Sequence, residues 1–188
     1  LQLDYSAAYK RSRQVSQRLT KGVSFLMKKN NIEVILGEGK LTAPGKLVVA
    51  LSDGGVEEVH AQDVILATGA HATVIPGMEP DGTKIWDYKH AILAESLPKS
   101  AVIIGGGAIG IEFATVWSGY GVEVSVVEML PHILPNEDEE AAAELAKALK
   151  KRGVKTFAGT KVKGVERTET GTRVLIESEK GEETLEAE

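Results

Sequence analysis

One segment in the middle of the chain restricts its possible folds more than any other. The apolar run Ala101–Ile104 is followed directly by Gly105, Gly107 and Gly110, which have GxGxxG spacing. Gly105 allows a tight turn, Gly107 lets the backbone approach a pyrophosphate, and Gly110 allows a helix to pack closely on the strand. A helix expected over about 109–118 would offer free N–H groups to the phosphates. The segment predicts a dinucleotide-binding strand–loop–helix unit, with a purely structural tight turn as the alternative.

A second apolar run follows at the spacing that such a unit needs. Residues 122–127 predict a strand, and Glu128 ends it, 18 residues after Gly110. An acid at this place accepts hydrogen bonds from the adenosine ribose and repels a 2′-phosphate. Residues 129–136 contain no Arg or Lys that could bind that phosphate. These features favour NAD over NADP, while FAD at the same motif and a solvated, non-binding Glu128 stay as alternatives.

Composition limits the class of protein further. The chain has 188 residues, of which 43% are hydrophobic and 26% charged, and it contains no cysteine. These values are typical of a globular protein and exclude a disulfide-stapled module. A net charge of −5 argues against general nucleic-acid binding. No apolar run reaches the ~18–20 residues of a membrane span, and no signal peptide is evident. We therefore expect a cytoplasmic protein without nucleic-acid, membrane or metal partners.

The remaining pattern predicts an α/β fold with two units. Apolar residues recur every four positions in a long helix over the first thirty residues, which Asn30-Asn31 ends. An antiparallel meander and a buried strand are expected next, with strands over 33–36, 47–51, 56–60 and 64–67 and a hairpin turn at 53–55. Residues 69–99 hold three of the six prolines and mark a boundary. Beyond the dinucleotide unit we expect a helix over 137–151 and strands over 154–157, 162–166 and 173–177.

Several motifs, in this order, resemble those of the flavoprotein pyridine nucleotide–disulfide oxidoreductases. They are Val64–Gly69, Ile75–Gly77, Gly105–Glu112 and Val126–Glu128. Within this family the resemblance is greatest to the dihydrolipoamide dehydrogenase branch, through Gly37–Lys40, Ile85–Asp87, Leu130-Pro131 and Ile133–Pro135. The resemblance covers essentially the whole chain. It implies an FAD- and NAD-dependent enzyme that oxidises dihydrolipoamide through a cysteine disulfide and reduces NAD⁺.

The resemblance also implies where each cofactor binds. Residues 1–72 would be the C-terminal part of an FAD-binding domain, and residues 73–188 a Rossmann-like NAD-binding domain that ends before its last strand. The residues implied for NAD are Gly105, Gly106, Gly107, Ala108, Ile109, Gly110, Ile111, Glu112, Glu128 and Val162, with Glu112 near the nicotinamide and Val162 near the adenine. Those implied for FAD are Gly39, Thr68, Gly69 and Ala70. Taken singly, these residues also have ordinary interpretations as turn, core or solvated positions.

Other features of the family are absent from the sequence. There is no CxxxxC pair, no glycine motif for FAD and no histidine followed by Glu-Pro, so we predict no catalytic residue in this chain. We expect an internal fragment of a longer homodimeric enzyme, inactive alone, whose substrate is carried by the lipoyl domain of a 2-oxo acid dehydrogenase complex. The alternatives are an NADH oxidase, a transhydrogenase, a mercuric-type reductase or a non-catalytic NAD(H)-binding module.

Overall fold

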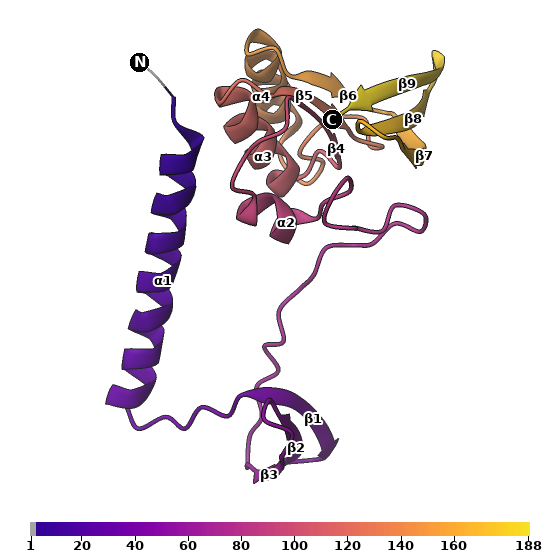
Figure 1. Cartoon of the computed structure of the whole chain (residues 1–188). Helices are drawn as coiled ribbons and strands as arrows, with labels where there is room; N and C mark the ends of the chain where they lie inside the picture. The colour runs from indigo at the N-terminus through magenta and orange to yellow at the C-terminus, as the bar shows by residue number, and fades with distance from the viewer. Residues whose placement is uncertain (1–2) are drawn as a thin grey trace. The chain divides into compact units, whose positions relative to one another are not determined.

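The computed structural model describes residues 3–188 as two compact units (Figure 1). The smaller unit comprises Arg11–His71, and the larger comprises the chain up to Lys10 together with Ala72–Glu188. Helix α1 (Tyr5–Lys29) crosses the boundary between these ranges. In the described part of the chain, no helix combines the length and the apolar character that crossing a membrane requires.

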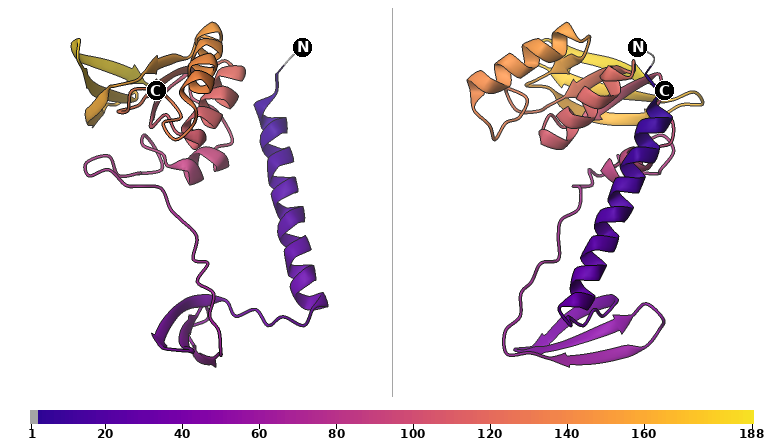
Figure 2. Two further views of the ribbon diagram at one scale, coloured as in Figure 1. Left: turned by 180° about the vertical axis from the view of Figure 1, so that it is seen from behind. Right: turned by 90° about the vertical axis from the view of Figure 1, so that its left-hand side faces the viewer.

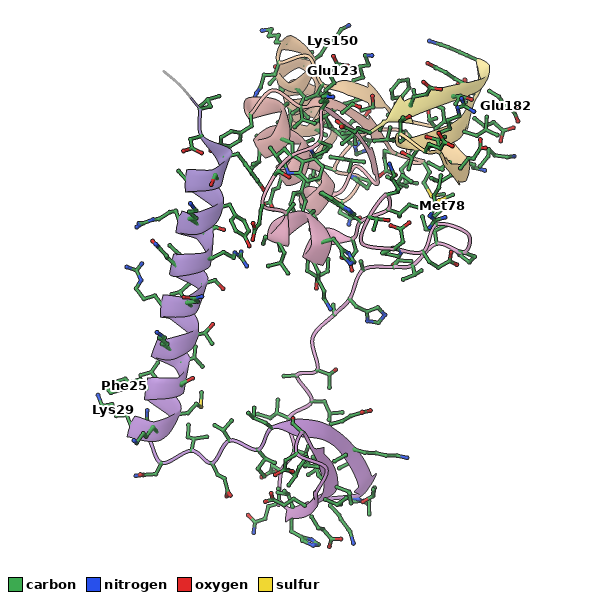
Figure 3. All side chains as sticks on the ribbon, viewed as in Figure 1. Phe25, Lys29, Met78, Glu123, Lys150 and Glu182 are labelled. Carbon is green, nitrogen blue, oxygen red and sulfur yellow. The ribbon has the colours of Figure 1, made fainter. Side chains whose placement is uncertain are left out.

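Helix α1 confirms the predicted long first helix. Its residues up to Lys10 belong to the larger unit, where the Tyr5 ring packs edge-on against Tyr120 at 5.3 Å between centroids. None of the helix residues is buried, and Phe25 projects into solvent near its C-terminus (Figure 3). Asn31 adopts a left-handed backbone conformation (φ 54°), and the Asn30 side-chain amide donates to the Leu26 carbonyl at 2.8 Å. The helix therefore ends where the sequence predicted.

The smaller unit contains a three-stranded antiparallel sheet. Its strands, in the order β1-β2-β3, are β1 (Gly37–Ala43), β2 (Lys46–Leu51) and β3 (Val56–His60). The predicted hairpin between β2 and β3 is confirmed, because the Gly54 N–H donates to the Leu51 carbonyl at 3.0 Å and Gly54 has φ 94°. Only glycine adopts this conformation readily, which explains the Asp-Gly-Gly sequence at the turn.

Two strands predicted for this unit are wrong. Residues 33–36 have no regular structure, and the strand begins at Gly37, in register with β2. Residues 64–67 are not a buried strand, since the side chains of Ile65 and Leu66 are 90% and 70% exposed. A buried strand needs hydrogen-bonded neighbours on both sides. Strands β1–β3 pair only with one another, so the described unit offers this segment no partner.

The larger unit is built on a three-stranded parallel sheet. Its strands, in the order β4-β5-β6, are β4 (Ser100–Ile104), β5 (Glu123–Val127) and β6 (Lys155–Phe157). Helix α3 (Ala108–Gly119) connects β4 to β5, and helix α4 (Glu139–Lys151) connects β5 to β6. These five elements confirm the strand–helix alternation predicted from the sequence, because parallel neighbours need a crossover connection.

Each face of the parallel sheet is covered by a different layer (Figures 1 and 2). On one face, Val124 and Val126 of β5 pack with Trp117 of α3 and Leu149 of α4. On the other face, Val127 packs against an antiparallel sheet of β7 (Lys161–Arg167), β8 (Thr172–Ser178) and β9 (Gly181–Ala187). Strands β7 and β8 were predicted, whereas β9 and the short helix α2 (Tyr88–Leu93) were not. This architecture places the Gly-rich turn between β4 and α3.

The segment before α2 is tied to β7 by one carboxylate. Asp81 Oδ1 accepts hydrogen bonds from the backbone N–H groups of residues 83–85 at 2.7–3.0 Å. Its Oδ2 accepts one from Arg167 Nε at 2.6 Å. The Arg167 guanidinium, followed by the backbone N–H groups, holds the pKa of the Asp81 carboxyl well below its usual range. Asp81 thus joins a loop to a strand far away in the sequence.

We expect the order of residues 77–87 to depend on pH through Asp81. A depressed carboxyl pKa means that the unfolded segment takes up its proton at a higher pH than the folded one. The stabilisation is therefore complete above the ordinary aspartate pKa of about 3.9, and it decreases progressively as the pH falls from there toward the much lower pKa of folded Asp81. Hydrogen-exchange protection of residues 77–87 should decrease from pH 7 to pH 3 in the wild type and be low throughout in Asp81→Asn. Asp63→Asn, at an exposed aspartate, is the control and should keep the wild-type pH profile. If Asp81→Asn also shows the wild-type pH profile of protection, this role of Asp81 is contradicted.

Candidate dinucleotide-binding site

The turn after β4 depends on two glycines for its shape. Gly105 has φ 106°, a conformation that other residues rarely adopt, and its N–H donates to the Val127 carbonyl at 2.8 Å. A Cβ atom on Gly110 would lie 2.2 Å from the Gly105 carbonyl oxygen and 3.2 Å from Cγ2 of Ile103. Helix α3 can therefore approach β4 this closely only without a side chain at residue 110.

Gly107 has a different environment from the other two glycines. It is the N-cap residue of α3, with an extended backbone (φ −71°, ψ 179°) and no side-chain hydrogen bond capping the helix. A Cβ atom on Gly107 would meet nothing within 4 Å. The first-turn N–H groups of a helix carry partial positive charge and need acceptors. Open space at this uncapped N-terminus fits the pyrophosphate of a dinucleotide.

Glu128 lies at the end of β5, beside the same turn. Its side chain is 7% exposed, Oε2 accepts from the Gly106 N–H at 2.7 Å, and Oε1 accepts from the Leu130 N–H at 2.9 Å. The alternative of a solvated strand-end acid is therefore wrong. A carboxylate has about four acceptor positions, so each oxygen keeps capacity for a ribose hydroxyl. The backbone of the turn holds Glu128 in one orientation before any ligand binds.

Residues 129–136, which we call the strap, cover the turn from the other side. The Leu134 N–H donates to the Gly106 carbonyl at 2.7 Å, and Ile133 is 2% exposed. A Cβ atom on Gly106 would lie 3.0 Å from Glu128 Cβ and 3.2 Å from Ile133 Cγ2. Sequence reasoning used this segment only for its lack of Arg and Lys and for its resemblance to the family, and it missed these contacts. The apolar Ile133 was the one available signal.

The other residues implied for NAD are divided between surface and core. Ala108, Ile109 and Glu112 are exposed on the N-terminal half of α3 and are free to meet a ligand. Ile111 is 5% exposed and belongs to the core between helix and sheet, so that only its backbone is available. Val162 lies on β7, packed beside Val127, the residue that precedes Glu128. These positions stay predictions.

The residues implied for FAD lie in the smaller unit. Gly39 is on β1 opposite Val49, and residues 68–70 have no regular structure; all four are exposed. Within the described residues no hydrogen bond joins the 68–70 segment to β1. Their role in FAD binding stays a prediction. The described residues also contain no group of three or more His, Asp or Glu side chains that could hold a metal ion.

Comparison with known protein families identifies the family of this chain. The family described as pyridine nucleotide-disulphide oxidoreductase matches residues 2–188. The chain belongs to this family. A dihydrolipoyl dehydrogenase of Rhizobium etli is 45% identical over 192 residues, which cover 95% of this chain and 40% of the relative. One from Mycobacterium leprae is 46% identical over 176 residues, which cover 92% and 37%.

Solved structures of the family support the same assignment. The crystal structure of LpdA from Mycobacterium tuberculosis matches with a TM-score of 0.87 and 27% identity, covering 100% of this chain and 41% of LpdA. The HOCl-induced flavoprotein disulfide reductase RclA from Escherichia coli matches with a TM-score of 0.81 and 28% identity, covering 98% of this chain and 41% of RclA. The predicted α/β fold class is confirmed. The chain spans about two-fifths of the length of these family members.

Proposed function

We propose that this chain is the central part of an NAD- and FAD-dependent dihydrolipoamide dehydrogenase. The observation that carries the proposal is the uncapped N-terminus of α3 at Gly107, placed beside a buried Glu128 that the turn already orients. An oxidoreductase of this family needs a nicotinamide dinucleotide held in a fixed position, and these residues supply that function. The names of relatives that are 45% and 46% identical support dihydrolipoamide as the reductant.

The chain's own residues would bind and orient NAD. The Gly107 N–H and the other N–H groups at the α3 N-terminus would hold the pyrophosphate, because the Gly105 and Gly106 N–H groups already donate to Val127 and Glu128. Glu128 would accept hydrogen bonds from the adenosine ribose. Val162 would lie near the adenine and Glu112 near the nicotinamide. Bound NAD⁺ supplies the hydride acceptor. The protein contributes position and electrostatics, and the carboxylate of Glu128 disfavours a nucleotide with a 2′-phosphate.

The proposed enzyme also needs FAD, a redox-active cysteine pair and an acid–base histidine. We expect other parts of the whole protein to supply the cysteines and this histidine. We place residues 1–72 in the FAD-binding domain and residues 73–188 in the NAD-binding domain. Gly39, Thr68, Gly69 and Ala70, which are all exposed, would contact FAD together with residues of the rest of the enzyme. The whole enzyme would be a cytoplasmic homodimer that accepts electrons from the lipoyl domain of a 2-oxo acid dehydrogenase complex.

The proposal is tested by the turnover of the full-length protein with dihydrolipoamide. We expect NADH formation from NAD⁺ and much slower reduction of NADP⁺, because Glu128 would repel the 2′-phosphate. Consumption of NADH by oxygen without any reaction of dihydrolipoamide would replace the proposal by an NADH oxidase. If the protein binds NADH but shows no turnover, the proposal is replaced by a non-catalytic NAD(H)-binding module.

A further inference from the structure

The strap holds a specific peptide group of the glycine turn. The Leu134 N–H donates to the Gly106 carbonyl at 2.7 Å, and that carbonyl belongs to the same planar peptide unit as the Gly107 N–H. In a trans peptide the carbonyl and the N–H point in opposite directions. By fixing the Gly106 carbonyl toward the strap, Leu134 fixes the Gly107 N–H in the opposite direction, away from the strap.

The preceding peptide unit of the turn is fixed from the other side. The Gly106 N–H donates to Glu128 Oε2 at 2.7 Å, and Glu128 Oε1 accepts from Leu130, the second residue of the strap. The strap itself is anchored, because the Gly159 N–H donates to the Leu130 carbonyl at 2.8 Å. Two successive peptide planes of the turn therefore have their orientations set by Glu128 and by the strap.

The backbone and burial of the strap show that this geometry is imposed by its surroundings. Leu134 has φ 50°, a left-handed conformation that leucine rarely adopts. Such conformations persist only where neighbouring contacts determine them. Here the neighbours are Ile133, which is 2% exposed and adjacent to Gly106, and the Glu137 N–H, which donates to the Leu134 carbonyl at 2.9 Å.

We propose that Ile133 and Leu134 are positioning residues for dinucleotide binding, acting through the orientation of the Gly106–Gly107 peptide. This inference rests on the proposed function, since it specifies how the same turn binds the pyrophosphate. Ile133 wedges the strap against the turn, and Leu134 makes the hydrogen bond that directs the Gly107 N–H. The Ile133 side chain is 2% exposed, so it acts on a ligand only through the turn. Their effect on affinity comes from keeping a donor group aligned before the ligand arrives.

The test is equilibrium binding of ADP-ribose to the full-length protein by calorimetry. ADP-ribose carries the adenosine ribose and the pyrophosphate without the nicotinamide, so that it reports on the turn independently of hydride transfer. We expect Ile133→Ala to raise the Kd for ADP-ribose about tenfold, and Ile133→Val to raise it less. Leu134→Gly, which adopts the left-handed backbone easily and keeps the N–H, should bind more tightly than Ile133→Ala.

Leu149→Ala is the matched control, because Leu149 is 1% exposed in the same core cluster but lies on α4. It should lower the thermal unfolding temperature at least as much as Ile133→Ala while leaving the Kd for ADP-ribose unchanged. Equal Kd values for Ile133→Val, Ile133→Ala and the wild type would overturn the positioning role and leave the proposed function standing. Failure of the wild type to bind ADP-ribose would overturn both. If Ile133→Ala does not fold, Ile133→Val decides the question: a Kd above that of the wild type supports the positioning role, and a Kd equal to it overturns that role.

Discussion

Replacing Gly107 with valine should abolish tight NADH binding by the full-length protein and leave its folding intact. A Cβ atom at this position meets nothing within 4 Å, and the backbone conformation suits any residue. The fold therefore tolerates the side chain, which would instead occupy the space in front of the helix N-terminus. Hydrogen bonds to charged groups contribute about 1.5–3 kcal/mol each. The loss of one or two corresponds to roughly a ten- to hundredfold weaker Kd or more.

Gly110→Ala is the matched comparison for this prediction. Its Cβ would lie 2.2 Å from the Gly105 carbonyl oxygen, so that α3 must move away from β4. We expect Gly110→Ala to lower the unfolding temperature, whereas Gly107→Val should unfold like the wild type. NADH fluorescence titration and thermal unfolding of both variants separate the two roles. Binding of NADH by Gly107→Val with wild-type affinity would show that the turn is structural only.

The second large effect is expected from Glu128→Arg. Removal of the carboxylate deletes the acceptor for the ribose and leaves the Gly106 and Leu130 N–H groups without their partner. A guanidinium at this place attracts a 2′-phosphate, as Arg does in NADP-binding sites. We expect NADH to bind roughly ten- to a hundredfold more weakly, on the scale of one lost charged hydrogen bond. NADPH should improve relative to NADH.

Glu128→Gln distinguishes loss of the ribose contact from reversal of charge. In wild type the Gly106 and Leu130 N–H groups donate to different carboxylate oxygens. Glutamine replaces one of these oxygens with an NH2 donor, so one of the two N–H groups loses its acceptor. Glu128→Gln should therefore weaken NADH binding without shifting preference strongly toward NADPH. Parallel titrations with NADH and NADPH provide the measurement. An unchanged ratio of the two affinities in Glu128→Arg would remove Glu128 from the ribose site.

The parts of the fold that the sequence predicted correctly have local and strongly periodic signals. Strands β4 and β5 are apolar runs, α3 lies between them, and the Asp-Gly-Gly turn has glycine where φ is positive. Strands β1 and β9 were not expected, because their glycine- and glutamate-rich sequences have low strand propensity. They form through pairing with β2 and β8, whose registers single-sequence patterns do not contain.

At residues 64–67 the sequence predicted a strand that the structure does not have. Their apolar sequence is typical of a buried parallel strand, yet the described unit has no neighbouring strand to pair with them. Propensity expresses how well a side chain fits a half-buried sheet, and it cannot create the partner strand. Helix α2 was missed for a different reason: it has only six residues, and its start is marked by a capping box between Asp87 and His90.

The candidate site was predictable where it depends on spacing. The three glycines and Glu128 follow from intervals along the chain, and the structure places Gly106 and Glu128 in direct contact. The strap was not predictable, because its hydrogen bond from Leu134 to Gly106 joins residues that only the fold brings together. The Asp81–Arg167 ion pair was not predictable for the same reason, because its residues are 86 positions apart in sequence.

A crystal structure of the full-length protein with NADH bound would test the central claim most directly. The account predicts the pyrophosphate at the N-terminus of α3, within hydrogen-bond distance of the Gly107 N–H. It also predicts the Glu128 carboxylate on the adenosine ribose, still holding the Gly106 N–H. A nucleotide bound elsewhere, with the space in front of Gly107 filled by water alone, would contradict it.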